Sequence, residues 1–478
     1  YQDHQLPLFF NTDNHPQEPM FSYILAVGFW IFGVSVFTLR LIPALIGICT
    51  VVLFYYFVRR WWGDRMALIA GLLLATCKWH VMFSRLCFRT ILTPFITIMM
   101  VWLLLEGMER IKDKFQWRYF IVSGICLGLG MYTYISFRIM PVLVFLLVAH
   151  QLFHTRRQDD YEPRLWKGMG LTFLVGFVIF LPLLIDFIHN PFHFSGRTDE
   201  ITVFSGGYGE GIRMILSNTY KTLCMMGIPK LGDPEWKHNF SGEPILPLWL
   251  FLFWLVGIYR MFQNRKDLHL AAMGLMFGLY LVPGIMSQGA PNSLRTLGAV
   301  PALCFMTAYG MDGLWKIDFL NLKSWLKVGL VVVLLLGGGV WTWHQYFVMW
   351  GPDTRTAQHF NINEYRLARS IHQSDVKADF YLQDVLASQP TIRFTAYPVT
   401  LKSVTNLSEI PAPESLVRDA VVVFLNPRMF NMESNWEDQL LSQYPHAELK
   451  TELMESSPSP WVLAYYINVN TLGRNTAQ

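Results

Sequence analysis

Charged residues are scarce in this sequence. Asp, Glu, Lys and Arg make up 15% of its 478 residues, hydrophobic residues make up 53%, and the mean hydropathy is +0.32. A soluble globular domain carries about 25% charged residues, so this composition excludes an ordinary soluble protein. The alternating segments of a membrane barrel are also missing. We therefore expect an all-α polytopic membrane protein.

Several other signals are missing. The six cysteines show no metal-ligand spacing, and the C-terminal region has none, so no disulfide framework is indicated. That region also lacks a Gly-rich phosphate loop, which argues against a nucleotide site there. The net charge of +4 is explained by basic loops and indicates no nucleic-acid partner. The chain starts at Tyr1 without a visible signal peptide, and we expect at least one further helix upstream.

About ten apolar segments lie between residues 39 and 346, although several are shorter than the roughly 20 residues of a typical span. They are approximately Leu39–Val58, Met66–Phe83, Thr90–Met108, Tyr119–Tyr134, Ile139–Phe153, Leu171–Ile188, Leu246–Ile258, Leu268–Met286, Leu297–Met311 and Val328–Tyr346. The apolar segment Pro19–Gly33 precedes them and contains Tyr23, Trp30 and Phe32. It is short for a span and fits an interfacial helix better. A long outer loop is expected from His189 to Pro244.

Basic residues set the orientation, because loops rich in Lys and Arg stay in the cytoplasm. Alternate loops contain most of them: Arg59, Arg60 and Arg65; Arg110, Lys112, Lys114 and Arg118; Arg156, Arg157, Arg164 and Lys167; Arg260, Arg265 and Lys266; Lys316, Lys323 and Lys327. The opposite loops nevertheless hold Arg85, Arg89, Arg138 and Arg295. Four arginines on the outer surface require a reason, and an anionic ligand is the simplest one.

Residues 347–478 differ in character from residues 1–346. Short β-rich runs at Ala378–Leu382, Ala420–Leu425 and Trp461–Ile467, and a helical run at Trp436–Tyr444, predict a small α/β domain. The count of spans places this domain on the extracytoplasmic side. We expect it to act as a lid or docking module.

The outer arginines are the strongest candidate site. Arg85 and Arg89 are four residues apart, so one helical turn would place both on one face. Guanidinium groups bind phosphate oxygens in pairs. We predict that the four arginines converge on one cavity that binds a lipid phosphate. The alternative is that they extend toward lipid headgroups. Lys78 and His80, about one turn deeper, could extend the basic site or could equally extend toward headgroups.

Other residues near the outer surface could contact a substrate. Glu18 lies at the membrane boundary, where burial could suit it to proton transfer, although a solvated loop acid is the simpler interpretation. His15, Asn292, Tyr132 and Tyr134 are candidate substrate contacts, and the tyrosines could equally belong to an aromatic girdle. Glycines 128 and 130 before them favour close helix packing. A metal site at Asp233, His238 and Asn239 near Trp236 has no supporting ligand spacing, so none is predicted.

Several motifs together resemble a known superfamily. Glu18-Pro19 leads into the aromatic interfacial helix, and the sequences Arg-Leu-Ile-Pro-Ala-Leu-Ile-Gly from Arg40, Phe-Ser-Arg from Phe83 and Gly-Leu-Gly-Met-Tyr-Thr-Tyr from Gly128 follow in order. This pattern resembles the GT-C superfamily of polyprenyl-phosphate-dependent glycosyltransferases, and within it the protein O-mannosyltransferase and aminoarabinose-transferase group. The resemblance covers roughly residues 1–346.

The resemblance implies transfer of a sugar from a polyprenyl phosphate to an acceptor hydroxyl at the extracytoplasmic face, with inversion of the anomeric carbon. The carbohydrate, and whether the acceptor is a protein, lipid or glycan, stay open. A carboxylate would act as base, fixed cations would stabilise the leaving phosphate, and no metal or cofactor is obligatory. The catalytic Asp-Glu of the family is expected upstream of Tyr1, so the present chain alone could be inactive.

The sequence departs from the family pattern at two further positions. Thr90 stands where some relatives have Asp, and Arg138 lies near a position where relatives often have Lys. Alternative interpretations are a transporter or flippase for a lipid-linked sugar, and a non-catalytic membrane scaffold. The expected location is a multi-pass membrane, the plasma membrane if the source is bacterial.

Overall fold

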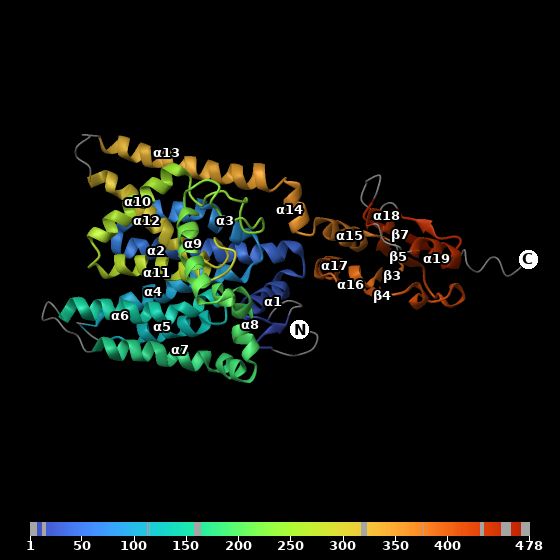
Figure 1. The fold of residues 1–478 in the computed structure, drawn as a ribbon, viewed down its shortest axis with the longest axis horizontal. Coiled ribbons are helices and arrows are strands. Elements are labelled where there is room, and N and C mark those ends of the chain that lie inside the picture. The colour runs from blue at the N-terminus through green and yellow to red at the C-terminus, as the bar shows by residue number, and fades with distance from the viewer. Residues whose placement is uncertain are drawn as a thin grey trace, which may run out of the picture. The chain divides into compact units, whose positions relative to one another are not determined.

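The computed structural model describes residues 7–11, 16–111, 113, 115–156, 164–316, 323–375, 377–430, 435–450 and 460–469. Its contacts divide the chain into two units, one of Tyr1–Gly33 with Phe37–Pro352 and one of Val34–Val36 with Asp353–Gln478. The first unit is helical, and the second contains a sheet with helices (Figure 1). The first unit extends six residues past the predicted limit at 346 because a π-helix, η6 (His344–Trp350), continues the last long helix.

The N-terminal segment forms a small ribbon before its first helix. Strands β1 (Phe10–Asn11) and β2 (Pro16–Gln17) pair antiparallel, and α1 (Met20–Phe32) follows. The backbone N–H of Met20 donates a hydrogen bond to the Tyr132 carbonyl at 3.2 Å. Helix α1 coincides with the predicted interfacial segment Pro19–Gly33, and its end is apolar and exposed, as expected for contact with lipid.

The long helices of the first unit run side by side in Figure 1, with α13 along one edge and α7 along the other. The elements are α2 (Val36–Thr76), α3 (Lys78–Arg85), η1 (Arg89–Ile91), α4 (Leu92–Arg110), α5 (Trp117–Gly130), η2 (Ile135–Ile139), α6 (Met140–Arg156), α7 (Arg164–His189), α8 (Pro191–Ile201), η3 (Val203–Gly206), α9 (Tyr208–Cys224), α10 (Leu248–Gln263), α11 (Leu268–Ile285), η4 (Leu297–Ala299), α12 (Val300–Asp312), η5 (Gly313–Lys316), α13 (Ser324–Trp343) and η6.

Among the described residues, seven helical segments are long and apolar enough to cross a membrane. One of them, α2, is interrupted at Gly63, where φ is 79°. Glycine adopts this backbone conformation without a steric penalty, so the chain can turn there. Helix α2 contains the predicted span Leu39–Val58 and the first part of Met66–Phe83, which continues in α3. The shorter apolar helices α5 and α10 match two further predicted spans. The prediction of an all-α polytopic membrane protein is confirmed.

Burial separates central helices from peripheral ones. In the apolar stretch of Leu297–Trp315, which contains α12, the buried share is 83%. In the apolar stretches of α7 and of α13 with η6 the buried share is only 22%. Helices that are apolar on all sides yet exposed in the isolated chain are expected to face lipid. Helix α12 therefore lies in the core of the bundle, and α7 and α13 lie at its edge.

The segment from His189 to Pro244 is largely helical rather than the long loop expected from the sequence, since α8, η3 and α9 occupy most of residues 191–224. In α9, Tyr208, Ile212, Leu216 and Tyr220 recur every four residues and are exposed. This period is typical of an amphipathic helix. The sequence analysis missed it because glycines and polar residues interrupt the apolar pattern.

The second unit has a five-stranded mixed sheet of order β4-β3-β5-β7-β6. Strands β3, β4 and β5 are parallel, whereas β7 is antiparallel to β5 and β6. Its elements are α14 (Thr354–His359), α15 (Ile362–Gln373), β3 (Asp379–Gln383), α16 (Asp384–Ala387), α17 (Pro390–Ala396), β4 (Leu401–Val404), η7 (Leu407–Glu409), η8 (Pro413–Ser415), β5 (Ala420–Leu425), α18 (Pro427–Phe430), α19 (Trp436–Gln443), β6 (Glu448–Leu449) and β7 (Val462–Ile467).

Both faces of this sheet are buried. Val421 and Val423 of β5 pack in a cluster with residues of α15 and α17, whereas Val422 and Phe424 pack in a second cluster with Leu440 of α19. Alternate side chains of a strand point to opposite faces, so the sheet is the middle of three layers. The three predicted strands and the predicted helix are present, and the predicted α/β class is confirmed. Strand β4 and helices α15 and α17 were not predicted.

Candidate functional site

A cavity of about 550 Å³ in the first unit brings together residues from distant parts of the chain. Helix α1, the segment after α3, η2, α8 and the segments around residues 237 and 295 contribute to it. Its charged lining residues are Glu18, Arg89, Arg138, Lys237 and Arg295. The lining therefore contains four cationic side chains and one carboxylate, which favours an anionic ligand.

Glu18 is the centre of the charged network. Its side chain is only 4% exposed, and its two oxygens each meet a guanidinium group. Oε1 accepts a hydrogen bond from Arg138 Nη2 at 3.2 Å, and Oε2 lies 3.2 Å from Arg89 Nη2. A buried charge is tolerated when it is paired in this way. Glu18 is therefore not the solvated loop acid of the simpler interpretation, and the geometry favours a role in positioning these arginines.

Arg138 is held in place on several sides. Its Nη1 donates a hydrogen bond to the Phe194 carbonyl at 2.9 Å. The guanidinium carbon also lies 4.9 Å from the ring centres of both Phe187 and Phe194. Such contacts restrict the guanidinium and add cation–π stabilisation. Arg138 therefore has a fixed position at the wall of the cavity.

Arg89 and Arg85 point to different places, which corrects the prediction that all four arginines share one cavity. Helix α3 ends at Arg85, and the following residues are extended before η1 starts at Arg89, so the two are not on one helical face. Arg85 donates to the Tyr346 hydroxyl at 3.2 Å and lies over the Phe347 ring. It is not among the described residues that line the cavity. Arg89 lies 5.4 Å from the Tyr134 ring centre.

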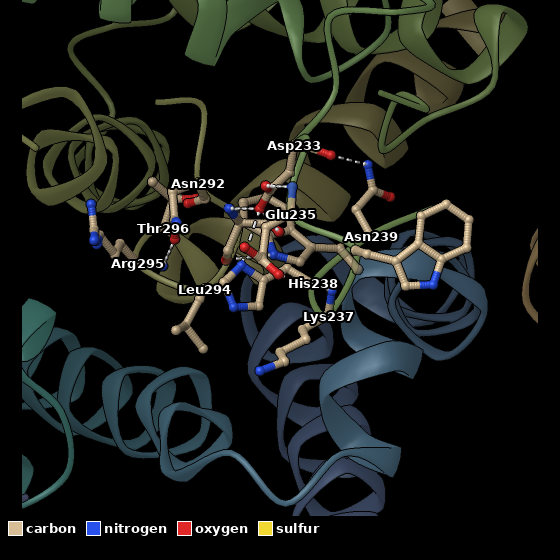
Figure 2. A network of polar contacts seen from close by, with 12 residues as sticks. Asp233, Glu235, Lys237, His238, Asn239, Asn292, Leu294, Arg295 and Thr296 are labelled. Carbon is tan, nitrogen blue, oxygen red and sulfur yellow. Dashed lines mark hydrogen bonds and ion pairs between the residues drawn. The ribbon is translucent and has the colours of Figure 1, made fainter. Parts of the chain in front are cut away.

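Arg295 lies in the turn before η4. Its backbone N–H donates to the Asn292 side-chain oxygen at 3.0 Å, and its Nη1 donates to the Gln288 carbonyl at 3.0 Å. Asn292 therefore shapes the turn that presents Arg295, and it does not itself line the cavity. In Figure 2 the Arg295 side chain points away from Asp233.

Asp233 joins two loops next to this turn (Figure 2). Its Oδ2 accepts from the backbone N–H of Ser293 at 2.6 Å and from the Ser293 hydroxyl at 2.5 Å, and His238 Nδ1 lies 3.4 Å away. Asn239 donates to the Asp233 and Glu243 carbonyls. The described residues contain no cluster of three or more metal-ligating side chains. The network fixes the loop that carries Lys237 against the turn that carries Arg295.

The two tyrosines predicted as substrate contacts, Tyr132 and Tyr134, line different cavities. Tyr134 lines the cavity, whereas the Tyr132 hydroxyl donates to the Ile179 carbonyl at 2.8 Å. Tyr132 instead lines a second, apolar cavity of about 600 Å³ between α1 and the neighbouring helices. The other predicted substrate contact, His15, lies outside the described residues.

Three titratable residues among the described residues of the cavity wall were not singled out from the sequence. Lys237 lies in a polar loop, and His193 follows a proline helix start, where local spacing gives no sign of the cavity. Cys87 is the third, and burial raises the pKa of its thiol to about 11. The thiol therefore stays protonated at neutral pH, which argues against a cysteine nucleophile.

Lys78 and His80 lie deeper and away from this cavity. Both are buried: Lys78 Nζ lies 5.0 Å from the Trp341 ring centre, and His80 Nε2 lies 3.2 Å from the Gly47 carbonyl. Neither of the two interpretations open from the sequence, a deeper extension of the basic site or an extension toward lipid headgroups, describes these buried side chains, because α3 is packed inside the bundle.

Comparison with known proteins supports the family resemblance. The family model of dolichyl-phosphate-mannose-protein mannosyltransferases matches residues 14–185. None of the curated proteins matches the sequence. Among solved structures, ArnT from Cupriavidus metallidurans in the apo state is similar, with 13% identity, a TM-score of 0.53, and coverage of 95% of this chain and 88% of ArnT.

Two further structures have the same fold. ArnT from Cupriavidus metallidurans bound to undecaprenyl phosphate gives a TM-score of 0.54 at 14% identity, covering 94% of this chain and 87% of that one. The Archaeoglobus fulgidus oligosaccharyltransferase in complex with Zn and sulfate gives 0.51 at 15% identity, covering 94% and 64%. The resemblance to the GT-C superfamily is thus confirmed, and the chain has the GT-C fold.

Proposed function

We propose that this GT-C membrane protein transfers a sugar from a polyprenyl phosphate to an acceptor hydroxyl at the extracytoplasmic face, by a single inverting displacement. The observation that carries this proposal is the cavity in which Arg89, Arg138, Lys237 and Arg295 face one carboxylate. Like charges repel at short range, so the free cavity is electrostatically incomplete without an anion. A phosphate group supplies that anion.

The position of helix α1 favours a phosphate attached to a lipid. Glu18 and Phe21 near its start line the charged cavity, whereas Met20, Tyr23 and Ile24 line the apolar one. The first turns of one helix therefore separate a site suited to a charged headgroup from a site suited to hydrocarbon. An amphiphilic donor has both parts. The names of the matched family and of the lipid-bound ArnT structure refer to dolichyl phosphate and undecaprenyl phosphate.

The chemistry requires stabilisation of the departing phosphate. As the bond from the anomeric carbon to the phosphate oxygen breaks, negative charge grows on the phosphate, and fixed guanidinium groups lower the energy of that state. Arginine is suited to this role because it stays charged when it is partly desolvated. Glu18 holds Arg89 and Arg138 in position before the donor arrives.

Replacing Arg89 by Ala should weaken binding of undecaprenyl phosphate. Loss of a charged hydrogen bond costs about 1.5–3 kcal/mol, or roughly a 10- to 150-fold rise in the dissociation constant. Arg85→Ala is the matched control, because Arg85 lies four residues away and contacts Tyr346 outside the cavity. Both variants can be compared by fluorescence or calorimetric titration in nanodiscs.

The two variants separate the donor-site proposal from non-specific attraction to lipid. Equal weakening by both, or unchanged binding in Arg89→Ala, would contradict it. Competition by inorganic phosphate as strong as by the lipid would show that the site recognises a soluble phosphate. Tight binding of undecaprenyl phosphate without transfer of any linked sugar would favour the transporter alternative.

The proposed orientation has a separate test. A cysteine introduced at Arg265, in the basic loop before α11, and one at Ser408, in the second unit, should react with an impermeant maleimide on opposite sides of the membrane. The expectation follows from the basic residues of the inner loops. Labelling of both positions from one side would make the extracytoplasmic assignment wrong.

A further inference from the structure

Two exposed arginines, Arg40 and Arg85, form a basic cluster outside the charged cavity. Arg40 lies in the second turn of α2, and Arg85 is the last residue of α3. Arg40 Nη1 donates a hydrogen bond to the Arg85 carbonyl at 3.1 Å. Among the described residues, these two guanidinium groups contact carbonyl, hydroxyl and ring groups but no carboxylate. Neighbouring cations without a carboxylate attract an anion.

The π-helix η6 fixes the Arg85 guanidinium from one side. Arg85 Nε donates to the Tyr346 hydroxyl at 3.2 Å, and Cζ lies 5.4 Å from the Tyr346 ring centre and 5.2 Å from the Phe347 ring centre. Turns of π-helix are rare and occur frequently at functional sites. Within the described part of the chain, Nε is the side-chain nitrogen of Arg85 that has a hydrogen-bond partner. The two terminal nitrogens therefore present the fork that suits phosphate oxygens.

An exposed apolar row ends beside this basic cluster. It consists of five residues of α13 and η6, each between 44% and 65% exposed and three or four positions from the next: Val333, Leu336, Val340, Trp343 and Phe347. This spacing places the five side chains on one face of the helix. Helix α13 lies along one edge of the bundle (Figure 1). A surface suited to hydrocarbon thus leads directly to the Arg85 guanidinium, since Phe347 belongs to both.

We propose that Arg40 and Arg85 bind the phosphate of an anionic phospholipid whose acyl chains lie along this apolar row. A headgroup with one net negative charge, as in phosphatidylglycerol, offers the oxygens that a guanidinium binds in pairs. The choline of a zwitterionic lipid would bring a positive charge to the same place. The site is separate from the donor cavity, because of the described residues Arg89 lines that cavity, whereas Arg40 and Arg85 do not.

The simpler interpretation is that both arginines only extend toward headgroups of any kind. Diffuse attraction of one basic residue to an anionic surface changes affinity by about five-fold. It depends on charge alone, so lysine should replace arginine. Loss of a charged hydrogen bond in a specific site changes affinity by roughly 10- to 150-fold. Lysine then recovers only part of the loss, because it lacks the planar fork.

The test counts phosphatidylglycerol bound to the full chain by native mass spectrometry, at increasing fractions of this lipid in phosphatidylcholine nanodiscs. Arg40→Ala and Arg85→Ala should each need roughly 10- to 150-fold more phosphatidylglycerol for half occupancy, and Arg85→Lys should fall between them and the wild type. Arg213→Ala is the control and should match the wild type, because Arg213 is an exposed arginine of α9, which contributes nothing to the basic cluster. Phosphatidylglycerol should also raise the unfolding temperature of the wild type but not of the two alanine variants.

The outcomes separate this site from its alternatives. Arg89→Ala should leave phosphatidylglycerol occupancy unchanged while it weakens binding of undecaprenyl phosphate, so this inference stands or fails independently of the proposed sugar transfer. Equal losses in Arg85→Ala and Arg213→Ala, or full recovery in Arg85→Lys, would overturn the site in favour of diffuse attraction. Displacement of the lipid by inorganic phosphate, or by undecaprenyl phosphate at equal mole fraction, would overturn the assignment to a phospholipid. A lower unfolding temperature in pure phosphatidylcholine, with unchanged occupancy, would reduce the cluster to a structural link.

Discussion

Glu18→Ala should destabilise the protein by about 3–5 kcal/mol, because it leaves buried positive charge without its partner. Arg138 and Arg89 are only 18% and 21% exposed, and both pair with Glu18. Removal of the carboxylate would also allow the two guanidinium groups to repel each other. We therefore expect a lower unfolding temperature together with loss of the donor site.

Thermal unfolding of the purified protein in detergent checks this prediction. Glu18→Gln keeps the shape but not the charge and should show most of the loss, which separates electrostatics from packing. Removing Arg138 as well, in Glu18→Ala/Arg138→Ala, should recover part of the stability. Glu210→Ala is the control, since Glu210 is an exposed acid at the start of α9. A Glu18→Ala protein as stable as Glu210→Ala would refute the buried-charge explanation.

The outer position of several arginines could be predicted from the sequence, because the prediction depends only on local hydropathy and on the distribution of basic residues. Apolar segments of membrane length and basic inner loops can be read directly, and both are set by the bilayer. Residues such as Arg89, Arg138 and Arg295 were exceptions to that pattern, and the structure brings these three to one cavity. These arginines are far apart in the sequence, but each was predicted at the outer end of a span. A common depth in the membrane is what allowed the sequence to group them.

The direction of each side chain could not be predicted in the same way. Arg85 and Arg89 diverge because α3 ends between them, a boundary that no capping signal marked. Glu18 was interpreted as a proton-transfer group or a solvated loop acid because the sequence does not show that two arginines approach it. His193 was missed for a related reason. Proline at the start of α8 signals a helix, but only the packing of α8 against Arg138 places His193 at the cavity.

Contacts between helices could likewise be predicted from the sequence only in part. The sequence predicted close packing at Gly128, where an added Cβ would meet the Gly176 carbonyl at 2.8 Å. It gave no comparable signal for Gly257 and Gly310, which are single glycines in apolar helices about fifty residues apart. Their importance follows from the approach of α10 to α12, which is visible only in three dimensions.

Gly310→Ala should destabilise the bundle at the upper end of the about 1–3 kcal/mol expected for overpacking. A Cβ at Gly310 would lie 1.9 Å from the Phe253 carbonyl oxygen, and a Cβ at Gly257 would lie 1.9 Å from the Met306 carbonyl oxygen. Both obstacles are backbone atoms, so relief requires that α10 and α12 move apart rather than that a side chain rotates. Small residues allow such close contacts between membrane helices.

Gly278→Ala provides the matched control for this prediction. Gly278 lies in α11, another apolar helix, and an added Cβ there would meet nothing within 4 Å. Alanine favours a helix over glycine by about 0.5–1 kcal/mol, so this variant should unfold at the wild-type temperature or slightly above it. Gly257→Ala should behave like Gly310→Ala, because each glycine faces the backbone of the other helix. Unfolding temperatures that are equal for Gly310→Ala and Gly278→Ala would show that α10 and α12 are not in this close contact.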